Sequence, residues 1–221
     1  MLFGELLGRS DLGPPVAVGV LGAGNYGAAI ITQSTAIPQY EVTFVGDPNV
    51  EAARAACRWA GWGADRVALV ETAGEVRRAR ARGLVALSAD PALIRAADVD
   101  VVVEASGRAE AGAQAALQAF AARRHVVMVN KETDSVVGPL LARRARDAGV
   151  VYTQADGDQP ALLMALWDWA RLLGLEVIAA GKSHDVELVV DHAAKRVRVG
   201  GRELPLQPDA AEAAGSAHDG I

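Results

Sequence analysis

Four polar residues stand together where an apolar run gives way to a helical pattern: Asn130, Lys131, Glu132 and Asp134. A lysine at the carboxyl end of a buried strand can donate to a carbonyl oxygen that is gaining charge, or hold a carboxylate or phosphate. We therefore expect Lys131 to be catalytic, Asn130 to contact a cofactor, and the two acids to orient the lysine or contact the substrate. The alternative is a solvated loop in which Asp134 and its neighbour cap the next helix.

A glycine-rich loop with the spacing GxGxxG lies near the start of the chain, directly after an apolar run and before a helical pattern. This context is typical of dinucleotide binding. The first glycine allows a tight turn, the second lets a pyrophosphate approach the backbone, and the third lets the helix pack on the strand. The helix start also offers N–H groups to phosphates. The predicted cofactor ligands are Gly22, Gly24, Asn25, Tyr26 and Gly27; the alternative is a tight turn without a ligand.

Two further strand ends belong to the same prediction. Asp47 follows Gly27 by 20 residues, the separation expected for the acid that binds the adenosine ribose. An acid there repels a 2′-phosphate, which favours NAD over NADP, although Asp47 could instead cap a helix. The run VVVEASG ends in small residues against which a nicotinamide or ribose can lie, so Ser106 and Gly107 are expected beside the cofactor.

Two later junctions supply the remaining candidates. Asp158 precedes a Gln-Pro pair, so it is either a helix N-cap or a catalytic residue at a site for a substrate phosphate or carboxylate. Lys182 lies near the end of an expected strand over residues 175–183 and could reach the predicted cofactor crevice as a substrate ligand. His184 and His192 lack partners at ligand spacing, so no metal site is predicted.

Strand-like and helix-like segments alternate at least six times, which predicts an α/β fold of the Rossmann type: a doubly wound parallel sheet with right-handed crossovers. Expected strands include residues 16–24, 41–47 and 99–107, and a helix is expected over residues 135–149. The tail looks like two short strands joined by a turn. We expect an N-terminal arm over 1–14, a dinucleotide-binding domain over 15–155, and a truncated substrate or oligomerisation region over 156–221.

Composition excludes several classes of protein. A net charge of −5 argues against nucleic-acid binding, and the basic run at residues 77–82 is expected to be a solvated helix face. The single cysteine, Cys57, is expected in the core and fits a reducing cytoplasm. The sequence contains neither a signal peptide nor an apolar run long enough to span a membrane.

The blocks VGVLGAGNYG, DVVVEASG, HVVMVNKETDSVVGPLL and GVVYTQADGDQPALLMALWDWARLLGLEVIAAGKS together resemble the homoserine dehydrogenase-like NAD(P)-binding proteins. The resemblance covers residues 15 to about 183 and is greatest to the branch that often carries a C-terminal SAF domain and includes 1-deoxy-D-xylulose 5-phosphate reductoisomerase-like enzymes. It implies a role for Lys131 on the cofactor and substrate side. It also implies a substrate-facing loop at Gly157, Asp158 and Pro160. Members of the family usually continue into a substrate and oligomerisation domain.

These observations lead to a functional hypothesis. We expect an NAD(P)-dependent oxidoreductase that transfers hydride on a small polar carbonyl or alcohol, with a phosphosugar or amino-acid semialdehyde as the substrate class. The alternative is a non-catalytic NAD(P)-binding module, or a subunit that needs a partner chain. A homo-oligomer or a partner subunit is expected in either case.

Overall fold

The computed structural model describes residues 13–155, 161–180, 188–199 and 201–205. The chain divides into two compact units, Met1–Ala155 and Asp156–Ile221. No helix within the described residues is long and apolar enough to cross a membrane.

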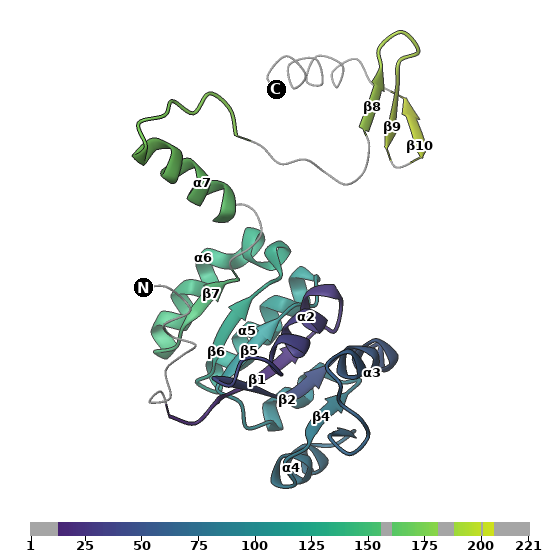
Figure 1. Ribbon diagram of the computed structural model, residues 1–221, viewed down its shortest axis with the longest axis vertical. Coiled ribbons are helices and arrows are strands. Elements are labelled where there is room, and N and C mark those ends of the chain that lie inside the picture. The colour runs from purple at the N-terminus through teal and green to yellow at the C-terminus, as the bar shows by residue number, and fades with distance from the viewer. Residues whose placement is uncertain (1–12, 156–160, 181–187, 200, 206–221) are drawn as a thin grey trace. The chain divides into compact units, whose positions relative to one another are not determined.

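The first unit is built on a seven-stranded sheet in the order β3-β4-β2-β1-β5-β6-β7, and every pairing in it is parallel (Figure 1). Its inner strands are nearly continuous apolar runs because both faces of the sheet are covered. The strands are β1 (Val16–Leu21), β2 (Tyr40–Gly46), β3 (Val67–Leu69), β4 (Val85–Ser88), β5 (Val101–Glu104), β6 (His125–Met128) and β7 (Tyr152–Gln154). The predicted doubly wound parallel sheet is confirmed.

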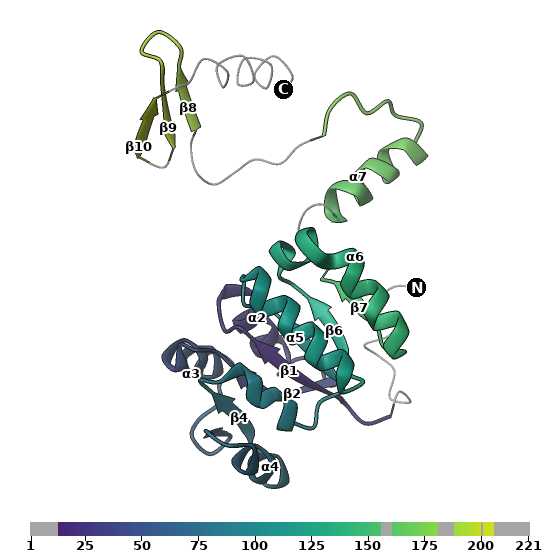
Figure 2. The same cartoon turned by 180° about the vertical axis from the view of Figure 1, so that it is seen from behind.

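Helices cover both faces of this sheet, as Figure 1 and Figure 2 show from opposite sides. One apolar cluster joins the sheet to α2 and α3; the other joins it to α4, η1, α5 and α6. The helices are α2 (Asn25–Gln33), α3 (Val50–Trp59), α4 (Ala73–Ala81), the 3-10 helix η1 (Pro91–Ala96), α5 (Ala109–Ala121) and α6 (Lys131–Ala148). The buried Cys57 lies in the first cluster, so its expected place in the core is confirmed.

The order of the strands creates a crevice beside β1. The chain runs from β1 to β2 on one side and later returns to place β5 on the other side. Open α/β sheets bind ligands at such a switch point, outside the carboxyl ends of the strands. The glycine loop follows β1, and the loop of residues 105–108 follows β5, so both lie at this edge.

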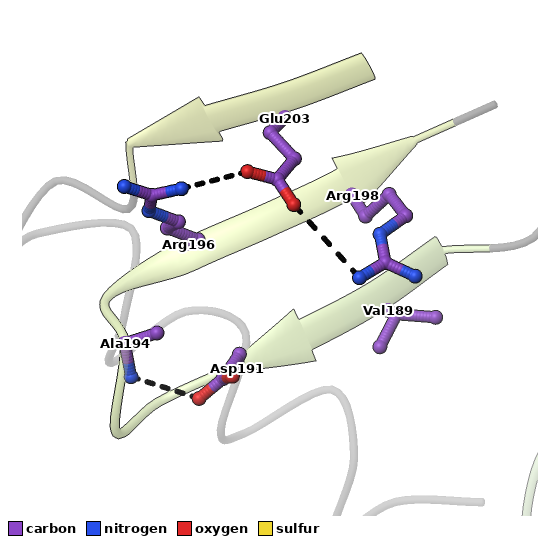
Figure 3. A pocket seen from close by; sticks show the side chains of 6 residues that line it. All are labelled: Val189, Asp191, Ala194, Arg196, Arg198 and Glu203. Carbon is purple, nitrogen blue, oxygen red and sulfur yellow. Dashed lines mark hydrogen bonds and ion pairs between the residues drawn. The ribbon is translucent and has the colours of Figure 1, made fainter. Parts of the chain in front are cut away.

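The second unit contains α7 (Ala161–Leu172) and a three-stranded antiparallel sheet of β8 (Leu188–Asp191), β9 (Arg196–Val199) and β10 (Arg202–Pro205). Glu203 lies between two arginines of β9 (Figure 3): it pairs with Arg196 at 2.7 Å and with Arg198 at 3.8 Å. The carboxylate offsets the positive charge of the hollow between these strands. The arginines are therefore engaged within the sheet itself.

Several boundaries differ from those expected from the sequence. The helix expected over 135–149 begins four residues earlier, at Lys131, because Asn130 caps it. Residues 175–180, expected to form a strand, are irregular. The short edge strand β3 was not expected, since its three residues are too few to give a pattern. The described residues of the tail form three strands where two were expected, and the chain turns at Gly201 before β10.

Candidate functional site

The glycine loop has the close contacts that its sequence predicts. Gly22 has a φ of +91°, and a Cβ there would lie 2.5 Å from the carbonyl oxygen of Ala105. A Cβ on Gly27 would lie 1.9 Å from the carbonyl oxygen of Gly22, so α2 can pack against the loop only if this residue is glycine. These two positions fix the turn and the approach of the helix.

Gly24 differs from the other two glycines of the motif. Apart from its immediate chain neighbours, no described residue has an atom within 4 Å of the position where its Cβ would stand. Gly24 is also the N-cap of α2; within the part of the chain that the structure describes, no side chain caps this helix, and its first turn contains no acid. The neighbouring Asn25 and Tyr26 are exposed. The backbone N–H groups at this helix start can donate hydrogen bonds to an anion.

Asp47 stands next to this loop and is held rigidly. Its Oδ2 accepts a hydrogen bond from the backbone N–H of Ala23 at 2.7 Å, and its Oδ1 accepts one from Asn49 at 2.7 Å. Asn49 caps α3 with its side chain, so the alternative that Asp47 is the helix cap is wrong. Each carboxylate oxygen retains lone-pair capacity for a further donor.

A cavity of about 230 Å³ opens between η1 and α5, lined by Leu21, Asp90, Pro91, Ala92, Ile94, Ala111, Gln114, Ala115 and Gln118. Its wall at Pro91 touches the end of β2, because a Cβ on Gly46 would lie 3.1 Å from the Cα of Pro91. Asp47 follows Gly46 directly, so Asp47 and the cavity lie at the same edge of the sheet.

The loop after β5 forms the other side of the crevice. Ser106 and Gly107 are exposed, and Gly107 has a φ of +70°. Ala105 donates to the carbonyl of Leu21 at 2.7 Å, which ties this loop to the end of β1. Ser106 and Gly107 therefore lie beside the glycine loop, as the sequence predicts for cofactor neighbours.

Asn130 faces the protein rather than solvent. Its side chain is 2% exposed, and its Nδ2 donates to the carbonyl of Arg108 at 3.0 Å and to Ser106 Oγ at 3.5 Å. Its Oδ1 accepts from the backbone N–H of Thr133 at 3.2 Å, which caps α6. The amide is thus engaged in joining α6 to the loop after β5, and this explains why the helix starts earlier than expected.

Lys131 and Glu132 occupy the first turn of α6, and both are exposed. Lys131 therefore extends from a fixed helix end at the carboxyl edge of β6. Asp134 is different: its Oδ1 accepts a hydrogen bond from the hydroxyl of Tyr152 at 2.7 Å. It does not cap α6, so that alternative is wrong. Burial, with Asp134 and Glu104 nearby, raises the pKa of Tyr152.

The sequence interpretation missed Glu104, the last residue of β5. Its side chain is 1% exposed, Oε1 accepts from the N–H of Ser106 at 3.1 Å, and Oε2 has no hydrogen-bond partner among the described residues. Burial raises the pKa of this carboxyl, while the polar groups of Ser106 and Asn130 oppose the shift. An acid at the end of an otherwise apolar strand is the sequence signal that could have identified it.

The remaining candidates, Asp158 and Lys182, lie outside the described residues. Among the residues that the structure describes, no cluster of histidine, cysteine or acidic side chains could hold a metal ion. The basic run at 77–82 lies largely on the exposed face of α4, where Arg80 pairs with Glu41 at 2.6 Å, as expected for a solvated helix face.

Comparison with known proteins gives one match to a family model. Residues 157–212 match the model described as oxidoreductase DRL, catalytic domain. The 1-deoxy-D-xylulose 5-phosphate reductoisomerase of Rhodopirellula baltica is 42% identical over 79 residues, which are 34% of this chain and 17% of that protein. This similarity supports the expected resemblance to reductoisomerase-like enzymes. The expected resemblance to homoserine dehydrogenases and to SAF-domain proteins remains a prediction.

Two solved structures share the fold. The WlbA dehydrogenase from Bordetella pertussis, in complex with NADH and UDP-GlcNAcA, has a TM-score of 0.52 at 18% identity, over 72% of this chain and 42% of that chain. The WlbA dehydrogenase from Chromobacterium violaceum has a TM-score of 0.53 at 13% identity, over 73% and 41% of the two chains. This chain therefore spans less than half of either protein.

Proposed function

We propose that this chain binds a nicotinamide dinucleotide at the carboxyl edge of β1 and β5 and takes part in hydride transfer on a small polar substrate. The geometry of Gly24 carries the proposal. Contacts among the described residues require glycine at Gly22 and Gly27 but not at Gly24, which lies at the start of α2, where backbone N–H groups can bind an anion. Close approach of a pyrophosphate is a physical reason for this third glycine.

The neighbouring residues suit the other parts of the same ligand. The carboxylate of Asp47 would accept hydrogen bonds from ribose hydroxyls, and the cavity between η1 and α5 would receive the adenine. Ser106 and Gly107 would line the nicotinamide side. Because a carboxylate repels a 2′-phosphate, the site favours NAD over NADP. When bound, the nicotinamide supplies a hydride donor or acceptor.

Lys131 is the proposed catalytic residue of the first unit. From its fixed position at the start of α6, its ammonium would donate to the substrate oxygen and stabilise the charge that develops there. Glu132 would contact polar substrate groups, Asp158 is proposed as a second catalytic residue, and Lys182 as a substrate ligand. The family match over residues 157–212 supports an oxidoreductase, with a phosphosugar or amino-acid semialdehyde as the substrate class.

A specific observation favours a second candidate, a binding module that needs a partner chain. Leu162, Leu166 and Trp169 recur at helical spacing on α7 and are 45%, 60% and 60% exposed. An exposed apolar stripe of this kind usually marks an interaction surface. A homo-oligomer or a partner subunit would cover it, and sedimentation of the purified chain would show whether it associates with itself.

The decisive experiment is a fluorescence titration of the full chain with NADH and NADPH. We expect NADH to bind more tightly, and Gly24→Val to weaken it at least about tenfold by blocking the pyrophosphate. The stability of that variant should fall by less than about 1 kcal/mol, because the new side chain points into open space. Asp47→Asn should reduce the preference for NADH over NADPH. Unchanged affinity in Gly24→Val would refute the site.

The role of Lys131 requires a separate measurement. Lys131→Ala should leave NADH affinity within about threefold while lowering turnover about a hundredfold or more, because only the developing charge on the substrate loses its partner. Turnover would be screened with small aldehydes and phosphosugars, using the preferred cofactor. An active Lys131→Ala variant would remove this residue from the mechanism.

A further inference from the structure

A buried polar cluster beneath the crevice joins three elements that the sequence keeps apart. Glu104 ends β5, while Asn130 and Thr133 belong to the start of α6. All three side chains are at most 2% exposed. They converge on α5 at Gly112, where an added Cβ would lie 2.2 Å from Thr133 Oγ1, 2.8 Å from Glu104 Oε2 and 2.9 Å from Asn130 Nδ2.

The hydrogen bonds of this cluster join the loop after β5, the first residue of α5 and the start of α6. The Glu104 side chain accepts from the N–H of Ser106, and its backbone carbonyl accepts from Val129 at 2.9 Å and Asn130 at 3.2 Å. Thr133 Oγ1 donates to the carbonyl of Ala109 at 3.0 Å. The carboxyl of Glu104 thereby holds the loop after β5, while the start of α6 is joined to the Glu104 backbone and, through the side chains of Asn130 and Thr133, to the carbonyls of Arg108 and Ala109.

Packing alone does not explain Glu104, because its buried Oε2 has no hydrogen-bond partner among the described residues. A buried polar atom without a hydrogen-bond partner is costly, and an apolar residue would fill a strand end at less cost. Gly112 adds a second cost, since glycine within a helix is less favourable than alanine. Both features are understandable if the cluster serves to hold the crevice in shape.

We propose that Glu104 is a positioning residue, whose buried carboxyl, packed with Asn130 and Thr133 against Gly112, fixes Lys131 opposite the loop of residues 105–108. The proposal rests on the proposed function, because it assigns a purpose to the spacing of two segments that would contact cofactor and substrate. Glu104 itself lies beneath these segments and acts through Ser106 and Asn130.

The test compares Glu104→Ala with Glu104→Gln in the full chain. Alanine leaves the N–H of Ser106 without its acceptor, so hydrogen exchange at Ser106 and Thr133 should accelerate about tenfold or more in the absence of cofactor. NADH should bind about tenfold more weakly. Glutamine keeps an acceptor of the same shape and should restore most of both losses. Equal exchange in wild type and Glu104→Ala would overturn the proposal, and so would a glutamine variant as impaired as alanine.

Gly112→Ala provides a second perturbation that leaves Glu104 in place. Its methyl group would push the three side chains apart, so NADH binding should weaken about as much as in Glu104→Ala, although alanine favours the helix. Gly74→Ala in α4 is the matched control, because a Cβ there would meet only a side-chain atom of Arg78, at 3.5 Å. Normal NADH binding by Gly112→Ala would overturn the proposal.

Failure of the proposed function would look different. If the wild-type chain bound neither NADH nor NADPH, the cofactor site would be wrong. The exchange rates at Ser106 and Thr133, measured without cofactor, would still show whether Glu104 holds the two segments together.

Discussion

At the scale of single residues, the candidate site depends on which atoms are already engaged within the protein. Asp47 is fixed by two backbone N–H groups, and the amide of Asn130 is used in capping and in holding a loop. Lys131 and Ser106 are exposed at the carboxyl edge of the sheet, where Ser106 Oγ also accepts from the amide of Asn130. A residue type suited to chemistry can therefore act directly or through a neighbour, and only its hydrogen-bond partners distinguish the two roles.

The titration of Glu104 gives a prediction about stability. Burial raises its pKa above the ordinary value of 4.5, so the folded chain binds the proton more tightly than the unfolded chain. This contribution to stability is full below the unfolded pKa and is lost as the pH rises through the folded pKa. Glu132 and Tyr152 interact electrostatically with the same carboxyl.

Glu104→Gln cannot lose this proton. Its unfolding free energy relative to wild type should therefore increase as the pH is raised from about 5 to 8, by at most about 1.4 kcal/mol per pH unit, the limit for one proton. Urea denaturation at a series of pH values measures the difference. A difference that stays constant with pH would show that Glu104 has the same pKa in both states.

At the scale of elements, the close packing of α2 against the end of β1 depends on glycine at Gly27. Alanine favours a helix over glycine by about 1 kcal/mol, so Gly27→Ala should stabilise α2 considered alone. In the folded chain its methyl group would collide with the carbonyl oxygen of Gly22. We expect a net loss of about 1–3 kcal/mol, measured by urea denaturation. Gly24→Ala, whose Cβ would meet no described residue beyond its chain neighbours, is the control. Equal stability of the two variants would contradict the close packing.

At the scale of the whole molecule, the two units differ in how they are stabilised. Every residue of the two apolar clusters lies between Val18 and Tyr152. In the second unit, the described residues of α7 and of the three-stranded sheet are largely exposed. The first unit thus has a complete core of its own, which is the physical condition for folding alone.

A chain ending at Ala155 tests this independence. Its thermal midpoint should lie within about 4 °C of that of the full chain, equivalent to about 1 kcal/mol for a domain of this size. NADH should still bind, because the glycine loop, Asp47 and residues 105–108 are all present. Circular dichroism and the fluorescence titration provide the two measurements. A truncated chain that fails to unfold cooperatively would show that the second unit completes the core.

The sequence by itself determined the fold class and the edge of the sheet at which the candidate site lies. Alternating apolar strands and amphipathic helices specify a parallel sheet, and the glycine spacing identifies the turn after β1, because both signals are local in the chain. Cys57 in the core and the solvated basic face of α4 followed from the same local patterns.

Only the tertiary structure determined which side chains bind other parts of the protein and which lie at the candidate site. The buried carboxyl of Glu104, the inward amide of Asn130 and the bond between Tyr152 and Asp134 join residues from different strands and helices. Gly112 is explained by three side chains distant in sequence. Such contacts depend on long-range packing, which a local pattern does not encode, and for this reason the start of α6 and the role of Glu104 were not predicted.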